Sequence, residues 1–532
     1  MRRASQAYLT VYLTLTTAVL LSLCLALIEH ARYAVIRLKT EIVMGTATES
    51  VLAEYHRELF RQYNLFAVDS SYGSAASGSA RTALHLKGYL DRNLETGNVW
   101  MSQVLYRDLT GMSVREVRIP EVCLLTDAGG AVFRHRAAQA VFDDLGLAAA
   151  RQALEWANTV QSSELEGLDV AELMDRAEQQ LKNRKSLADE ARRRATDAEN
   201  ARRREEWQRE SDSLRDRPQE DRSAAEEEPE NATDDPPPVE ISYLEEEYTS
   251  PVAAIRETAG TGILGVLLED PENLSKRELH PNVLIEGRTL DGQLSHGNLT
   301  PDLSGEWGDL MENALFREYL IRYFGYYGST SDRDALWYQV EYLIAGKTVD
   351  TGNLSSVAMR LLTLRSAADY LALLQDEQKK VEAKALGMAL ALAVLCPELE
   401  EAFSQMILLG WALMEGRYDV KNLLSGGRIP LFKTPEQWHC SLTGALSGNL
   451  WEPGETPQEG LCYRDYLRVL LLLTGTDALT MRAMNLMEAN IRMTKGNSLF
   501  RLDACIDCFY GEAVLESSFG YETIIRRAVS YG

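Results

Sequence analysis

One uncharged run near the N-terminus constrains this chain more than any other feature. Residues 7–28 carry no charge and are flanked by Arg2, Arg3 and Glu29. At about 1.5 Å per residue, a helix of this run just spans a bilayer core of about 30 Å. We therefore expect an uncleaved membrane anchor, with a cleaved signal peptide or a buried soluble helix as the alternatives. A signal peptide has a shorter apolar stretch and a small-residue cleavage site, which residues 25–29 do not offer.

The anchor predicts a protein that crosses the membrane once. A second apolar run, Ala385–Cys396, is followed by Pro397 and is too short to span a bilayer, so we expect a buried core helix there. Basic residues lie on both sides of the anchor and compete under the positive-inside rule. Because a short tail, residues 1–6, precedes a large domain, we expect the N-terminus in the cytoplasm and the head outside the cell membrane.

The helical pattern continues beyond the anchor, where apolar residues recur at positions i, i+3 and i+4. We expect a helical stalk over residues 29–69, with a break near Gly45. One face of this stalk is a candidate interaction surface, with packing on the protein's own head as the alternative. The face is formed by Val51, Tyr55, Leu59 and Tyr63.

The remaining pattern predicts an α+β head that is predominantly helical. Residues 70–175 form its first part and residues 251–532 the remainder. Val114, Ile119 and other apolar residues of Met112–Thr126 alternate with polar ones around Pro120, which is typical of an edge strand. We expect this strand to join C-terminal strands within Leu499–Tyr531 in a small antiparallel sheet. The expected helices are Leu84–Leu94, Trp337–Ala345, Val357–Gln375, Val381–Leu395, Glu400–Glu415, Tyr463–Leu473 and Ala478–Ile491.

Between the two parts of the head lies a strongly charged segment, residues 176–250. Ala191–Arg204 combines arginines with glutamates and predicts a solvated helix with ion pairs, the alternative being a basic docking strip. Glu220–Glu247 is acidic and contains four prolines, so we expect a disordered linker. The whole chain has 55 Lys and Arg against 79 Asp and Glu, a net charge of −24, which disfavours nucleic acid as a partner.

Several motifs resemble known sites but lack the required context. Gly260–Gly265 matches the dinucleotide-binding glycine pattern, yet the preceding residues make a poor buried strand, so we expect a turn. Ala345–Thr348 resembles the end of a P-loop, but Glu341 replaces its first glycine, so we expect Gly346 to cap a helix. His439 and Cys440 are adjacent, which rarely gives catalytic geometry. We therefore expect no catalytic, cofactor-binding or metal-binding residues.

Two cysteines near the C-terminus form a lone C-x-x-C pattern, Cys505 and Cys508. Residues three apart on a strand point to opposite faces, which argues against a redox dithiol. We expect structural thiols or partners in separate disulfides, and we keep an extracytoplasmic thiol enzyme as a third hypothesis for the function.

Short stretches across the chain resemble a largely uncharacterised family of membrane-anchored proteins of Gram-positive bacteria, encoded with tight-adherence (Tad, or Flp) pilus genes. The likeness covers both ends and most of the helical middle, but not the charged segment. It is carried by Tyr8–Leu13, Leu27–Arg32, Ser50–Leu59, Gln62–Asp69, Tyr338–Lys347, Asn353–Leu354, Ile407–Trp411, Pro430–Leu431, Asp465–Arg468 and Met487–Arg492.

The resemblance implies a pseudopilin-like accessory protein of the Tad machinery, with the N-terminal helix used for anchoring and for self-association. Tad-type prepilins carry a small residue and then a Glu about five positions on, just before or early in the apolar run, where a peptidase cuts. Residues 1–7 contain no Glu, so a non-polymerising accessory is expected. The expected function is thus a non-enzymatic, extracytoplasmic component that helps to assemble or anchor the pilus or its secretion machinery. The alternative is a surface binding or sensor module that recognises a cell-wall or extracellular ligand.

Overall fold

The computed structural model divides the chain into two compact units. Unit 1 comprises Met1–Ser162, Leu274–Val357 and Arg464–Gly532, and unit 2 comprises Ser163–Asn273 and Ala358–Tyr463. The structure describes residues 2–75, 78–95, 110–162, 193–194, 196–209, 212, 262–268, 270–280, 285, 308–393, 400–434, 437–442 and 460–531.

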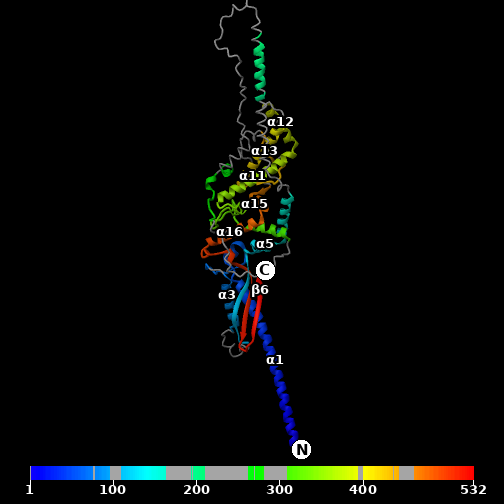
Figure 1. The fold of residues 1–532 in the computed structure, drawn as a ribbon, viewed down its shortest axis with the longest axis vertical. Helices are drawn as coiled ribbons and strands as arrows, with labels where there is room; N and C mark the ends of the chain where they lie inside the picture. The colour runs from blue at the N-terminus through cyan, green and yellow to red at the C-terminus, as the bar shows by residue number, and fades with distance from the viewer. Residues whose placement is uncertain are drawn as a thin grey trace, which may run out of the picture. The chain divides into compact units, whose positions relative to one another are not determined.

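Unit 1 begins with one long helix, α1 (Arg2–Leu52). The break expected near Gly45 is wrong, because the helix is continuous through this residue. A Cβ at position 45 would lie 3.0 Å from the Arg527 guanidinium. The glycine therefore leaves room for the Arg527 side chain and does not bend the helix. The N-terminal part of α1 projects away from the sheet of unit 1, whereas its C-terminal part lies beside that sheet (Figure 1).

An antiparallel sheet is the centre of unit 1. It joins the strand predicted within Met112–Thr126 to the C-terminal strands. Strand β5 (Cys505–Ser517) pairs with β2 (Met112–Leu124) on one side and with β6 (Glu522–Ser530) and the short β1 (Val68–Asp69) on the other. The edge strand β2 has a register shift between Arg118 and Glu121, where Pro120 lies. This confirms the sequence prediction, since proline is tolerated at edges and bulges.

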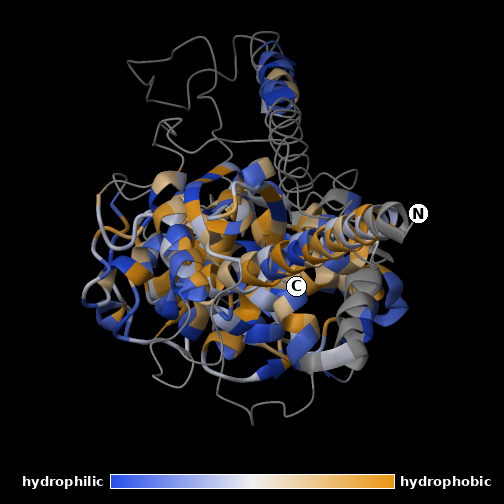
Figure 2. Ribbon diagram, turned by 90° about the horizontal axis from the view of Figure 1, so that it is seen from below, coloured by the Kyte–Doolittle hydropathy of each residue, from blue (hydrophilic) through white to orange (hydrophobic). Residues whose placement is uncertain are grey.

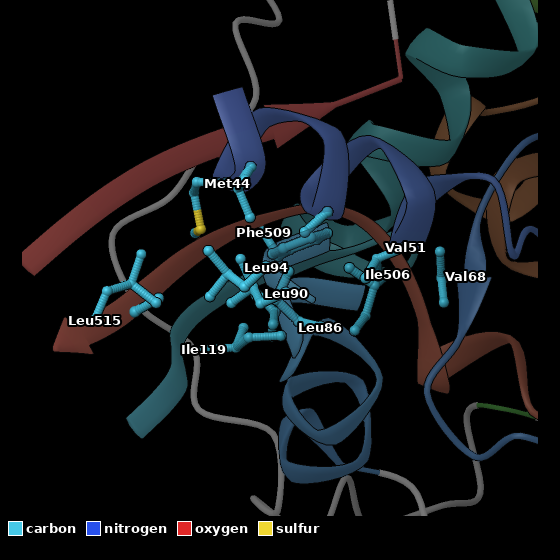
Figure 3. Close-up of a cluster of buried hydrophobic side chains, with 14 of the residues drawn as sticks. Met44, Val51, Val68, Leu86, Leu90, Leu94, Ile119, Ile506, Phe509 and Leu515 are labelled. Carbon is cyan, nitrogen blue, oxygen red and sulfur yellow. The ribbon is translucent and has the colours of Figure 1, made fainter. Parts of the chain in front are cut away.

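The core of unit 1 is formed where α1 and α3 (Ser79–Leu94) pack against this sheet. Figure 3 shows Met44 and Val51 from α1 meeting leucines of α3 and Phe509 of β5. The expected stalk therefore does not stand apart from the head, because one face of its helix, from Ile36 to Val51, is part of the head's own core.

Further helices complete unit 1. These are α2 (Arg57–Tyr63), α5 (Asp127–Ser162), α9 (Asp309–Tyr323), α10 (Gln339–Ala345), α15 (Tyr463–Leu472) and α16 (Thr476–Met493), together with the 3₁₀ turn η8 (Leu502–Ala504). Helix α5 packs against α9, and α16 packs against α2, α5 and α10. The helical path of α5 is interrupted at Gly146 and at residues 128–130.

Unit 2 is built mainly from α12 (Glu377–Ala393) and α13 (Glu400–Leu424), which pack against each other. Helix α11 (Asp350–Gln375) contains the unit boundary, after Val357. The smaller elements are α8 (Ile263–Leu267), the 3₁₀ turn η3 (Pro271–Asn273) and the paired short strands β3 (Arg428–Ile429) and β4 (Leu461–Cys462). Residues 196–209 are also helical, whereas the predicted linker, Glu220–Glu247, and Cys396 lie outside the described residues.

The chain is thus mainly helical with a small antiparallel sheet that includes the C-terminal strands, which confirms the predicted α+β class. The helices predicted beyond residue 330 correspond to α10, α11, α12, α13, α15 and α16. The largest extensions beyond the prediction are in α11, which begins at Asp350, and in α13, which continues to Leu424.

Candidate functional site

The projecting part of α1 has the composition and exposure of a membrane-spanning helix. Among the described residues it is the one helix that is long and apolar enough to cross a membrane, and its most apolar window has a mean hydropathy of 2.3 with none of it buried. Figure 2 shows the hydrophobic residues along this part of the helix. Such exposure of apolar side chains over six turns is unfavourable in water and matches the hydrocarbon of a bilayer.

Beyond the apolar run, α1 still exposes a strip of apolar side chains. Val35, Leu38 and Ile42 are 52%, 58% and 59% exposed. Their spacing of three and four residues places them on one side of the helix, and the buried Ile36, with others, faces the core. We call Val35, Leu38 and Ile42 the outer strip. An apolar strip with this spacing has the pattern of a helix–helix contact.

The interaction face predicted from the sequence lies elsewhere, largely inside unit 1. Val51 and Leu59 are fully buried, and Tyr63 is also buried, with its hydroxyl 2.7 Å from Asn490 Nδ2, which donates to it. Tyr55 is half-buried. Val51, Leu59 and Tyr63 therefore pack within the protein's own head, which is the alternative to an exposed interaction surface.

Tyr55 lines a surface groove of about 470 Å³ in unit 1. Its ring makes edge contacts with Phe60 and Phe66, and Phe66 stacks on Tyr531 with ring centroids 5.6 Å apart. Charged and amide side chains complete the lining, among them Arg136. Because these residues come from distant parts of the chain, no local sequence pattern indicated the groove.

The two thiols of the C-x-x-C pattern occupy different surroundings in β5. Cys505 is fully buried opposite Asp69, and burial raises the pKa of its thiol. Cys508 lies directly opposite Cys123 in the sheet, and both are buried. The hydrogen bond between the Cys123 and Cys508 side chains, together with burial, raises the pKa of Cys123. Buried thiols with raised pKa values are poor nucleophiles, which weakens the thiol-enzyme hypothesis.

Unit 2 contains a buried ionic cluster that the sequence analysis missed. Arg365 donates through Nε to Asp419 Oδ2 at 2.8 Å and through Nη2 to Asp369 Oδ1 at 2.9 Å. Lys433 Nζ donates to Asp419 Oδ1 at 2.6 Å and also to Glu415. All five side chains are essentially inaccessible to solvent. Periodicity alone did not distinguish them from ordinary surface charges of amphipathic helices.

Two carboxyl groups of this cluster have opposite pKa shifts. Burial raises the pKa of Asp369 to about 7, and the neighbouring carboxylates add to this effect while the positive charges of Arg365 and Lys433 oppose it. Burial also disfavours the charged form of Glu415, but hydrogen bonds from His439 and the Lys433 ammonium outweigh it and lower the pKa to about 2. Asp369 thus holds a proton near neutral pH, while Glu415 stays ionised.

The same cluster contains the one group of metal-capable side chains found among the described residues, Glu415, Asp419 and His439, whose donor atoms lie within 4.8 Å of one another. The Lys433 ammonium, however, contacts both carboxylates and supplies the positive charge that a metal would bring. Lys433 and Arg365 already neutralise this donor set, so it does not fit a metal centre.

Of the remaining motifs, Gly346 takes the structural role expected of it, whereas the turn expected at Gly260–Gly265 is helical from Ile263, and Gly260 lies outside the described residues. Gly346 ends α10 in the left-handed conformation, with φ of 72°, and donates its N–H to Tyr342 O. Gly262 precedes α8, which has only five residues. His439 stacks on Tyr418, and Cys440 donates its backbone N–H to Glu415, so this pair belongs to the ionic cluster.

These features define an α+β protein with one N-terminal helix suited to a single-pass membrane anchor. Residues 242–517, more than half of the chain, match the model of DUF5702, a family of unknown function, and the chain belongs to this family. No curated protein and no solved structure matches it. The family match begins after α1, so the anchor is a feature of this chain outside the matched region.

Proposed function

We propose that the protein is a non-enzymatic component anchored in the cell membrane by α1, with its head on the extracytoplasmic side. There it helps to assemble or anchor a Tad/Flp-type pilus or its secretion machinery. The pilus assignment and the extracytoplasmic orientation both rest on the sequence resemblance given above. The anchor rests on the exposed apolar part of α1.

The outer strip is the observation that carries the assembly role. It continues the apolar surface of the anchor along a helix whose other side is fixed in the core of unit 1. Since the described part of the head leaves Val35, Leu38 and Ile42 exposed, a second helix is the partner that fits them. A second copy of α1 or a helix of a pilus component has the required geometry.

Crosslinking from the outer strip tests this proposal. Leu38→Cys and Ile42→Cys, each in a Cys24→Ser background, are expected to form disulfide or bismaleimide products with a second copy or with Tad components in intact cells. Arg37→Cys is the matched control, because its side chain is exposed on the same helix away from the strip. Equal crosslinking yields from the outer strip and from Arg37→Cys would contradict the proposal. So would products that do not contain a second copy of the chain and that are unchanged in a strain lacking the pilus genes.

The surface groove lined by Tyr55 and Phe66 favours a second candidate function, a surface module that binds an extracellular ligand. Phe66 is partly exposed beside Tyr55, and the two rings offer an apolar surface in the groove, whereas the Arg136 guanidinium in the lining is already paired with Asp507. Fragments of cell-wall polymer added to the purified full chain would test it. Binding that is lost in Phe66→Ala but retained in Phe432→Ala, an exposed control in unit 2, would support a ligand site. Equal binding by both variants would count against it.

A further inference from the structure

The turn between β5 and β6 lies against α1 immediately beyond the apolar run. Tyr521 donates its hydroxyl to Glu29 Oε2 at 2.9 Å, and its ring makes an edge contact with Tyr33. The Arg32 guanidinium lies over the Phe519 ring, 4.0 Å from its centroid. Three separate contacts therefore fix the turn, residues 518–521, beside the first helical turn that follows the anchor.

This position sets the depth of the turn relative to a bilayer. Arg32 is four residues beyond Ile28, which is about 6 Å along a helix axis. The headgroup region adds about 5–7 Å to each side of the hydrocarbon core. The turn therefore lies at the level of the headgroups when residues 7–28 span the core. This argument holds for either orientation of the chain in the membrane.

The side chains of this region have the chemistry of a membrane interface. Phe519 is 47% exposed although it is a large aromatic residue, and Ile524 of β6 is 58% exposed. Aromatic rings are enriched at headgroup depth, where an apolar body and a polar edge are both satisfied. Arg32 pairs with Glu29 and the exposed Arg37 pairs with Glu41, so these charged groups suit the hydrated headgroup layer without adding net charge.

We propose that the β5–β6 turn, through Phe519, inserts into the headgroup region of the membrane that α1 spans and so gives the head a second attachment to the bilayer surface. The occupant of this surface is lipid, because the turn's own contacts with Glu29 and Arg32 hold it at the end of the anchor. The inference rests on the proposed anchoring by α1. It adds a function for a turn outside the matched family region.

Photo-crosslinking to lipid tests the inference on the full-length protein in nanodiscs of phosphatidylethanolamine and phosphatidylglycerol. A benzophenone amino acid is placed at one of three positions, Leu20, Phe519 or Ser530. Leu20 reports the anchor, and its side chain is exposed in α1. Ser530 is exposed at the far end of β6, eight residues from Glu522, about 26 Å along the strand.

The expected result is lipid adducts at Leu20 and Phe519, with at least a severalfold lower yield at Ser530. Because benzophenone resembles phenylalanine in shape, the substitution at Phe519 is compatible with folding. A yield at Phe519 no greater than at Ser530, with adducts at Leu20, would overturn the lipid contact and leave the anchor intact. An absence of adducts at Leu20 would instead overturn the anchor and the inference that depends on it.

Discussion

Arg136 of α5 and Asp507 of β5 form a bidentate ion pair inside unit 1. Arg136 Nε donates to Asp507 Oδ1 at 2.7 Å and Nη2 donates to Oδ2 at 3.0 Å, while the carboxylate is fully buried. The two residues belong to segments that lie before and after unit 2 in the sequence. The pair therefore joins parts of unit 1 that are distant along the chain.

Removing the guanidinium is expected to destabilise unit 1 strongly. Arg136→Ala leaves the buried Asp507 without its partner and should lower the free energy of unfolding by about 3–5 kcal/mol. The control Arg526→Ala breaks an exposed pair with Glu512 and should cost about 0–1 kcal/mol. Urea denaturation of the detergent-solubilised chain measures both. Similar losses for the two variants would contradict the structural role of the Arg136–Asp507 pair.

The protonated state of Asp369 predicts a stability that falls as pH rises. Its pKa is about 7 in the folded protein and near its ordinary value of about 3.9 in the unfolded chain. The folded state therefore holds the proton more tightly, so this contribution is fully present at acid pH and is lost as pH rises through 7. Arg365, Lys433, Asp419 and Glu415 are the charged groups that face it.

Thermal unfolding of the full chain between pH 5.5 and 8.5 measures this effect. Wild type should lose stability across this range, and Asp369→Asn, which stays neutral, should flatten the dependence. Glu377→Gln is the matched control on an exposed carboxylate and should leave the slope unchanged. Equal slopes in wild type and Asp369→Asn would show that Asp369 does not titrate near neutral pH.

Close packing of α1 on the sheet depends on a glycine in β5. A Cβ at Gly511 would lie 3.0 Å from Met44 Cε and 3.2 Å from Leu86 Cδ2. Gly511→Val should therefore lower the free energy of unfolding by about 1–3 kcal/mol through overpacking. A Cβ at Gly88 in α3 would meet no atom within 4 Å. Gly88→Ala should therefore raise the free energy of unfolding by about 0.5–1 kcal/mol. Denaturant midpoints that shift equally in both variants would contradict this packing.

Refolding from urea under oxidising conditions is expected to join Cys123 to Cys508, because both thiols are buried and poorly reactive in the folded protein. Residues directly opposite in an antiparallel pair have Cα atoms about 4.5–5.5 Å apart, within the range that a disulfide requires. With oxidised glutathione as the oxidant, the two thiols lose two hydrogens and glutathione is reduced. Peptide mapping should find this bond in wild type and in Cys505→Ala, but not in Cys508→Ala. A bond from Cys123 to another cysteine in wild type, or no bond at Cys123 at all, would refute the pairing.

Much of the fold could be predicted because it depends on local patterns. The apolar run predicts the length of the anchor, Pro120 identifies the edge strand, and Gly346 marks the end of α10. The predicted contact face failed for a different reason. The periodicity assumed one continuous helix, whereas α1 ends at Leu52, Leu59 and Tyr63 belong to the separate helix α2, and Tyr55 lies between the two.

The groove and the ionic cluster could not be predicted, because each depends on contacts between distant residues. Arg136 meets Asp507 and Arg365 meets Asp419 only after the chain has folded. In the sequence, these side chains look like the many other charges of an acidic chain. Their burial is the informative observation, and burial is a property of the fold.

The most direct test of the central claim is the sidedness of the anchored chain. Ser5→Cys and Ser530→Cys, each in a Cys24→Ser background, are treated in intact cells with a membrane-impermeant maleimide. The account predicts labelling of Ser530→Cys in intact cells and of Ser5→Cys only after the membrane is permeabilised. Labelling of Ser5→Cys alone in intact cells, or recovery of the protein in the soluble fraction, would contradict an extracytoplasmic head held by α1.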